Sequence, residues 1–349
     1  MQICKYDYFI VAASAGNHAL ALAYHGPLSD VPVSVVMPTV APLTKVSNCR
    51  AFGAEVLISG DHLLESRETA ASLGEEKGMT YVNGYDDPGI IAGQGTIGTE
   101  MLNQVPNLDA IMVPIGGGGL IAGVAVAVKA LNPHCEIIGI EPTRCASWTA
   151  ALHNGTPVPV DTRATLADGL AVTTVGSNAF RLAHELIDEV LTVKEGSIAL
   201  AVLRLLELER TVVEGGGATA IAGLLEHCQP NGKLARLKGK RVGAILCGGN
   251  IDMPVLGRVI ERGLAADGRI HRFVARVSDR PGGIAQLTQT IANAGASVKD
   301  LYHERAGIKD DYAMVSITVW METRDNEHAA DVRKALEAEG IYLVPQMST

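Results

Sequence analysis

Three short loops hold the residues of this sequence whose types and spacing could carry chemistry. In one of them Ile115 is followed by four consecutive glycines, Gly116, Gly117, Gly118 and Gly119, between an apolar run and a helical pattern. Each glycine costs roughly 0.5–1 kcal/mol in chain entropy relative to alanine, so a merely flexible turn explains them poorly. Free backbone N–H groups at the start of a helix bind anions, and this loop therefore predicts a phosphate site.

The same glycines also fit a dinucleotide-binding fingerprint. Gly117, Gly119 and Ala122 match the spacing GxGxxA, and Glu141 ends the next apolar run, about 20 residues further on as that fingerprint requires. On this loop alone, a nicotinamide-dependent enzyme remains an alternative.

The other two loops add polar groups. Asn17, in the loop SAGNH after the apolar run 9–13, can exchange a hydrogen bond with a ring hydroxyl, although the loop could also be an ordinary helix cap. Cys247 precedes Gly248 and Gly249 after the apolar run 242–246. Its thiol could offer a weak hydrogen bond to a ring nitrogen, or could simply be buried packing.

The segments that must position these loops alternate between short apolar runs and helical patterns. The predicted strands contain the runs YDYFIVAA, VPVSVVMP, AEVLI, AIMVPI, EIIGI and RVGAILC. The predicted helices cover residues 18–24, 41–52, 64–77, 95–104, 120–131, 198–208 and 218–227. Such alternation predicts an α/β fold with parallel sheets, in which ligands lie beyond the carboxyl ends of the strands.

The sequence changes character near residues 264–270. From there it reads as strand, helix, strand, strand, helix, strand, which predicts a separate βαββαβ unit. We therefore expect two domains, residues 1–266 and 270–349. Gly282 and Gly283 join the first strand of the second domain to its first helix, where they permit a ligand to approach the backbone or simply form a turn.

The composition excludes several classes of partner. The net charge of −9 and the 4% aromatic content leave neither a basic surface nor a stacking surface for nucleic acid. No apolar run reaches the roughly 18 residues of a membrane span. The six cysteines lack the spacing of a disulfide framework or a zinc site, which favours reduced thiols and a cytoplasmic location. They are Cys4, Cys49, Cys135, Cys145, Cys228 and Cys247.

In combination, the three loops resemble the fold-type II pyridoxal-phosphate enzymes, most closely the threonine and serine dehydratases (ammonia-lyases). The resemblance covers roughly residues 8–264, through FIVAASAGNHALALA, YDDPGIIAGQGTIGTE, VPIGGGGLIAGVA, TLADGLAV, VVEGGGATAIAGLL and LCGGNIDMPVLGRVIERGL. Residues 270–349 resemble an ACT domain, a small-molecule regulatory module. The dinucleotide alternative explains only one of these segments.

The resemblance implies a tryptophan synthase β-like fold with open parallel sheets in two subdomains, a ferredoxin-like ACT domain, and pyridoxal 5′-phosphate as cofactor. It implies Asn17 at the cofactor's 3′-hydroxyl, Gly116–Gly119 around its phosphate and Cys247 at its pyridine nitrogen. L-threonine or L-serine would give 2-oxobutanoate or pyruvate and ammonia, because a neutral pyridine favours β-elimination. We also expect a homo-oligomer, with an amino-acid effector near Gly282 and Gly283.

One element of the family pattern does not occur. The family's Schiff-base lysine lies in an SFKxRGA-like motif upstream of the SAGNH loop, and the 349 residues contain no such motif. Lys5 is the only lysine ahead of the loop, and we expect it at the solvent-facing start of a strand. The sequence therefore predicts no catalytic lysine in this chain. Either the N-terminus is incomplete, or the chain is a non-catalytic, amino-acid-binding or regulatory relative.

Other departures concern racemisation and metal binding. Ala15 stands where related serine racemases carry a second serine, so we expect no racemisation. Some relatives bind a divalent cation through a Glu and an Asp. Glu141 matches the former, but Ser147 stands at the expected Asp position, and no metal site is predicted. Asp168 and Glu214 lie in family-like segments, where they could face the substrate and cofactor or cap a helix or turn.

Overall fold

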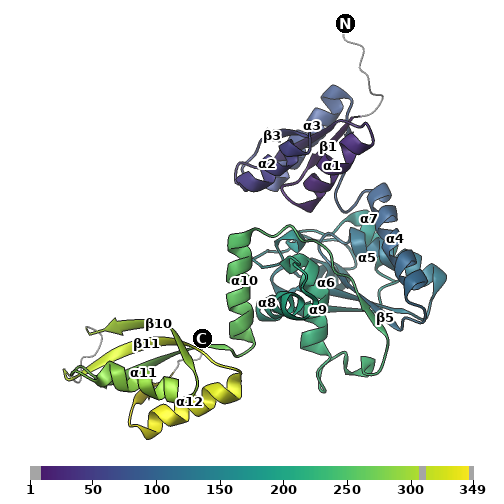
Figure 1. The fold of residues 1–349 in the computed structure, drawn as a ribbon. Helices are drawn as coiled ribbons and strands as arrows, with labels where there is room; N and C mark the ends of the chain where they lie inside the picture. Colours follow the sequence, from purple (N-terminus) through teal and green to yellow (C-terminus); the bar gives the residue numbers. More distant parts are fainter. Residues whose placement is uncertain (1–8, 306–311, 346–349) are drawn as a thin grey trace. The chain divides into compact units, whose positions relative to one another are not determined.

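The chain forms two compact units in the computed structural model, which describes residues 9–305 and 312–345. Unit 1 consists of Met1–Ile198 and Arg210–Asp252, and unit 2 of Ala199–Glu209 and Met253–Thr349 (Figure 1). Lys5 lies outside the described residues. The domain boundary expected between residues 266 and 270 stays a prediction.

Unit 1 contains a first sheet of four parallel strands in the order β3-β2-β1-β4. Their bounds are Ile10–Ala13 (β1), Val33–Met37 (β2), Glu55–Ile58 (β3) and Thr80–Tyr81 (β4). The helices of this part are Asn17–Leu28 (α1), Leu43–Ala51 (α2) and Leu63–Lys77 (α3). The valines of β1 and β2 are buried because helices cover both faces of a parallel sheet.

A second parallel sheet of unit 1 has the order β7-β6-β5-β8. Its strands are Ala110–Pro114 (β5), Glu136–Pro142 (β6), Glu189–Val193 (β7) and Val242–Ala244 (β8). The associated helices are Pro88–Gln104 (α4), Gly119–Leu131 (α5), Ser147–Asn154 (α6), Ser177–Ala183 (α7), Glu195–Arg204 (α8) and Gly215–His227 (α9). From Ala199 onward, α8 is counted with unit 2. Two parallel sheets confirm the fold class that the sequence predicts.

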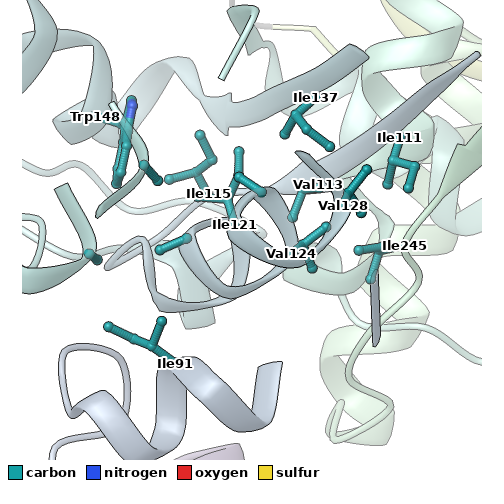
Figure 2. Packing of buried hydrophobic residues seen from close by; sticks show 14 of the residues in the cluster. Ile91, Ile111, Val113, Ile115, Ile121, Val124, Val128, Ile137, Trp148 and Ile245 are labelled. Atoms are coloured by element: carbon teal, nitrogen blue, oxygen red, sulfur yellow. The ribbon is translucent and has the colours of Figure 1, made fainter. Parts of the chain in front are cut away.

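The core of this second sheet is purely aliphatic over most of its extent. Ile111 and Val113 of β5 pack with Ile121 and Val124 of α5, and all four side chains are buried. Figure 2 shows Trp148 of α6 at one side of the cluster and Ile245, which follows β8, at the other. The cluster fixes the start of α5, and therefore the glycine loop, against the sheet.

Unit 2 carries the βαββαβ pattern that the sequence predicts. After α10 (Met253–Ala266) the elements are Ile270–Ser278 (β9), Gly283–Asn293 (α11), Ser297–Glu304 (β10), Met314–Glu322 (β11), Asn326–Ala338 (α12) and Tyr342–Val344 (β12). The strands pair antiparallel in the order β10-β11-β9-β12. Alternate residues of β11 are buried, as expected for a sheet with helices on one face. Within the described ranges, no helix is both long and apolar enough to cross a membrane.

Candidate functional site

The glycine loop and the Cys247 loop lie at the same edge of the second sheet. Strands β5 and β8 are parallel neighbours, with Ala110 opposite Val242 and Met112 opposite Ala244. Gly116 follows the end of β5, and Cys247 follows the end of β8. Carboxyl ends of neighbouring parallel strands meet at one edge, which is where open α/β sheets bind ligands. The structure thus brings together two of the three predicted loops.

The glycine loop presents buried backbone donors that lack acceptors. Gly116–Gly119 are buried. Among the described residues, none of their four N–H groups donates to a carbonyl or a side chain. Gly118 caps α5 in the left-handed region, with φ +95°, and supplies no capping side chain. Buried donors are rarely left unpaired in folded proteins. Together with the positive end of the helix dipole, these N–H groups fit a phosphate.

Three side chains wall the loop and explain why only glycine fits there. A Cβ at Gly117 would lie 2.2 Å from the ring of Tyr85, and a Cβ at Gly118 would lie 2.4 Å from the ring of Trp148. A Cβ at Gly116 would come within 3.0 Å of the Cα of Leu170, in the 3₁₀ turn Asp168–Leu170. The glycines are therefore required by close packing as well as by backbone conformation.

Asn17 reaches the site through Glu214, at the start of α9. The Nδ2 of Asn17 donates to Oε1 of Glu214 at 2.5 Å. Glu214 in turn donates its backbone N–H to the carbonyl of Gly248 at 3.0 Å. Burial raises the pKa of the Glu214 carboxyl, against the opposing effect of the Asn17 hydrogen bond. Glu214 therefore joins the Asn17 loop to the Cys247 loop.

The thiol of Cys247 is kept in its neutral form. Burial, with a smaller contribution from the nearby Glu214 carboxylate, raises its pKa to about 11. The first turn of α9 packs against its backbone, since a Cβ at Gly217 would collide with the Cys247 carbonyl oxygen. At neutral pH the side chain is a weak donor that transfers no proton to a ring nitrogen.

The remaining candidates lie in different surroundings. The Asp168 carboxylate accepts from the Gly169 N–H at 2.8 Å, and its charge helps to raise the pKa of Glu214. Ala15 packs against the apolar cluster of the first sheet. Glu141 lies near the end of β6 and Ser147 begins α6, but within the described residues no three His, Cys, Asp or Glu side chains are arranged to hold a metal ion. Gly282 belongs to unit 2 and is described separately below.

Sequence reasoning missed the walls of the glycine loop. Tyr85 stands within a segment already matched to the family, but nothing in the sequence relates it to a glycine 32 residues later. Trp148 is one of only two tryptophans, and that rarity was the one available signal. Leu170 carried no signal. Contacts of this kind depend on how distant segments pack, which periodicity does not report.

Together these groups match a flat, phosphate-bearing ligand. The glycine loop offers N–H donors to an anion, Asn17 offers an amide beside the Glu214 carboxylate, and Cys247 offers a neutral thiol at the same sheet edge as the glycines. Pyridoxal phosphate has the corresponding phosphate, ring hydroxyl and ring nitrogen. The residues present therefore fit this cofactor.

Comparisons with known proteins agree with this reading. The family described as "Pyridoxal-phosphate dependent enzyme" matches residues 7–248, and the ACT domain family matches residues 271–340. An L-threonine ammonia-lyase from Geobacter sulfurreducens is 42% identical, covering 96% of this chain and 82% of that protein. One from Thermotoga maritima is 38% identical, covering 95% and 81%.

A solved structure is similar over much of the chain. The processed form of threonine deaminase isoform 2 from Solanum lycopersicum superposes with a TM-score of 0.69 at 40% identity, covering 72% of this chain and 73% of that one. The buried N–H groups of the glycine loop, the family match and these relatives lead to one conclusion. The chain belongs to the family of pyridoxal-phosphate-dependent enzymes and carries an ACT domain in its C-terminal part.

Proposed function

We propose that this protein is a threonine/serine ammonia-lyase that converts L-threonine to 2-oxobutanoate, or L-serine to pyruvate, with release of ammonia. The observation that carries the proposal is the edge of the second sheet, where four glycine N–H groups with no acceptor among the described residues and the neutral thiol of Cys247 lie at the ends of neighbouring strands. The similarity to two L-threonine ammonia-lyases over nearly the whole chain supports it.

Each residue has a definite task in this proposal. The N–H groups of Gly116–Gly119 bind the phosphate, and Asn17 holds the ring hydroxyl while Glu214 orients its amide. Pyridoxal phosphate, when bound, would supply an electron sink for the α-carbon of the amino acid, which loses its α-proton and its β-hydroxyl together as water. Cys247 hydrogen-bonds the ring nitrogen without protonating it, which limits the electron demand and favours prompt elimination.

The absence of a hydroxyl at position 15 argues against racemisation. Racemisation needs an acid or base on each face of the α-carbon, and the methyl group of Ala15 moves no proton. We therefore propose elimination rather than inversion. Formation of D-serine by the active enzyme would contradict this.

The ACT domain supports a regulatory part of the proposal. An amino-acid effector would bind at the loop of Gly282 and Gly283, where a Cβ on Gly282 would meet nothing within 4 Å, although Gly283 packs against the backbone of Ser278. Coupling of about 1–3 kcal/mol to the catalytic unit is typical of such regulation. A homo-oligomeric state and a cytoplasmic location also belong to the proposal. The free cysteines among the described residues support the location.

The test is ammonia and 2-oxo acid release from L-threonine and L-serine in the presence of pyridoxal phosphate. It is made on the 349-residue chain and on any longer protein that the same reading frame encodes. No SFKxRGA-like motif occurs in the 349 residues, so we expect both proteins to bind the cofactor and only one that contains the motif to turn over. Turnover by the 349-residue chain would assign the lysine role to a residue within it. A complete product that binds the cofactor but releases no ammonia would instead support the non-catalytic, amino-acid-binding alternative.

A further inference from the structure

A buried carboxylate holds the start of α6. Glu141, at the end of β6, is fully buried. Its Oε2 accepts from the backbone N–H of Trp148 at 3.0 Å, and its Oε1 accepts from the N–H of Thr149 at 3.0 Å and from the Thr149 hydroxyl. These N–H groups belong to the first turn of α6, where no intrahelical acceptor exists. One carboxylate thus fixes the first turn of α6 with three hydrogen bonds.

The first turn of α6 carries the side chain that walls the phosphate loop. Trp148 is fully buried, and its ring is packed so close to Gly118 that a Cβ there would lie 2.4 Å away. On its other sides the ring contacts the apolar cluster and lies 5.5 Å from the ring of Phe180, between centroids. A shift of the helix start would therefore move the surface against which Gly118 rests.

Gly118 is the residue of the loop whose conformation needs such support. Its φ of +95° and its place as the cap of α5 determine how the loop N–H groups are presented. Those N–H groups repel one another electrostatically until an anion arrives, and no side chain of the described chain compensates them. A rigid wall keeps the loop in its binding conformation before the anion binds, which lowers the cost of ordering it.

We propose that Glu141 is a positioning residue for the cofactor phosphate, acting through Trp148 on Gly118. This inference rests on the proposed cofactor site. It assigns to Glu141 a role in positioning α6 and not in binding a metal ion. Three donors already occupy its two oxygens, and Ser147, at the start of α6, has no carboxylate to share a metal. A purely structural cap would change the stability of α6 but would leave phosphate recognition unaltered.

The test follows ligand binding through the fluorescence of Trp148, which lies against the glycine loop. The only other tryptophan is Trp320 in β11 of unit 2, so Trp320→Phe leaves emission from Trp148 alone. Dissociation constants are measured for pyridoxal phosphate and for pyridoxal, which has the same ring without the phosphate. The dissociation constant for pyridoxal divided by that for pyridoxal phosphate reports the phosphate contribution and requires no turnover.

In that background Glu141→Gln should weaken pyridoxal phosphate binding about tenfold, as loss of charge-assisted hydrogen bonds does, while the constant for pyridoxal stays the same. Glu226→Gln is the matched control. The Glu226 carboxylate also accepts from a backbone N–H and a hydroxyl near the start of a helix, those of Lys194 and Ser197, but it holds α8 instead of α6. It should leave the ratio unchanged.

A double-mutant cycle tests whether Glu141 acts through the indole. Trp148→Phe keeps the backbone N–H that donates to Glu141 but replaces the indole against Gly118 with a smaller ring. Because this variant lacks the reporter tryptophan, its cofactor binding is followed by the absorbance of the cofactor. If Glu141 acts through the ring, the effects of Glu141→Gln and Trp148→Phe on the ratio are clearly less than additive. Fully additive effects would contradict the proposal. Should Glu141→Gln fail to fold, Thr149→Val, which removes only the hydroxyl donor, should still lower the ratio about threefold.

The outcomes separate this inference from the proposed function. If the Trp320→Phe protein binds pyridoxal phosphate no more tightly than pyridoxal, the cofactor site itself is wrong. If it discriminates between them and Glu141→Gln discriminates equally well, the site stands and the positioning role of Glu141 is wrong.

Discussion

Two glycine caps, one in each unit, have nearly the same backbone conformation in different surroundings. Gly118 begins α5 with φ +95° and ψ −10°, and Gly282 begins α11 with φ +105° and ψ −23°. Both follow a strand, both precede a second glycine, and neither helix has a capping side chain. Local chain geometry is therefore the same in the catalytic and regulatory parts of the molecule.

The surroundings of the two caps differ. A Cβ at Gly118 would collide with Trp148 and come within 3.2 Å of Ala179, whereas a Cβ at Gly282 would meet nothing within 4 Å. In the proposed function, the first cap belongs to a site whose walls are already in place and which accepts a ligand of fixed shape. The second cap is open, because a Cβ at Gly282 would meet nothing within 4 Å. It would therefore bind a ligand selectively only if a second copy of the chain or another partner covered it. The walls distinguish the two sites, and the backbone conformation does not.

Gly118→Ala is expected to have the largest effect. The left-handed conformation costs an alanine about 1–2 kcal/mol, and the overlap with the indole adds about 1–3 kcal/mol. Urea unfolding of the Trp320→Phe protein, followed by Trp148 emission, should show unit 1 destabilised by about 2–5 kcal/mol. A loss of only about 1–2 kcal/mol, the backbone part alone, would mean that Trp148 does not pack against the loop.

Gly282→Ala should have only the backbone part of that effect. Unfolding of unit 2 followed by Trp320 emission, in a Trp148→Phe background, should show a loss of about 1–2 kcal/mol. Pyridoxal phosphate affinity should stay the same. A loss as large as that for Gly118→Ala would show that the open cap is walled too, and the comparison would fail.

Glu214→Gln tests whether the carboxyl group of Glu214, beside the glycine loop, is shielded from water in the folded chain. Burial raises the pKa of Glu214 in the folded chain. A carboxyl with a raised pKa stabilises the fold when it is protonated, and this contribution is lost as the pH rises from the usual value of about 4.3 through the folded value. The free energy of unfolding of the variant, minus that of the wild type, should therefore increase between pH 4 and pH 7.5.

The same pH series on Glu226→Gln serves as the control for that experiment. A difference that stays flat with pH for Glu214→Gln would mean that its carboxyl is as well solvated in the folded chain as in the unfolded chain.

Cys247→Ser should have the smallest effect. A neutral hydroxyl replaces a neutral thiol, so pyridoxal phosphate affinity should change by less than about threefold. With its pKa raised to about 11, the wild-type thiol stays protonated. The affinity for pyridoxal phosphate should therefore depend on pH in the same way in the wild type and in Cys247→Ser between pH 6 and pH 9. An inflection near the ordinary thiol value, in the wild type alone, would show that Cys247 ionises.

The fold was largely predictable because its signals are local. The buried runs AIMVPI and EIIGI became β5 and β6, and the pattern after residue 270 became the βαββαβ unit. Elements with mixed burial were missed, among them strand β7 (EVLTV) and the short helices α6 and α7. A strand flanked by charged residues and a helix of two turns present too few apolar positions to show a period.

The site was predictable in its loops and not in its contacts. Glycines in succession and a cysteine at a strand end are visible in the sequence, and parallel pairing of β5 with β8 brings those two loops together. The bond from Asn17 to Glu214 joins residues 197 positions apart, and the walls formed by Tyr85 and Trp148 are equally non-local. Only tertiary packing determines such contacts.

The most direct test of the account is the phosphorus NMR resonance of pyridoxal phosphate bound to the wild-type chain, recorded from pH 5.5 to pH 8.5. A phosphate group held by the N–H groups of Gly116–Gly119 and the start of α5 should stay dianionic, so its resonance should not move with pH. A resonance that titrates near pH 6, as a solvated phosphate monoester does, would contradict the glycine loop as the phosphate site.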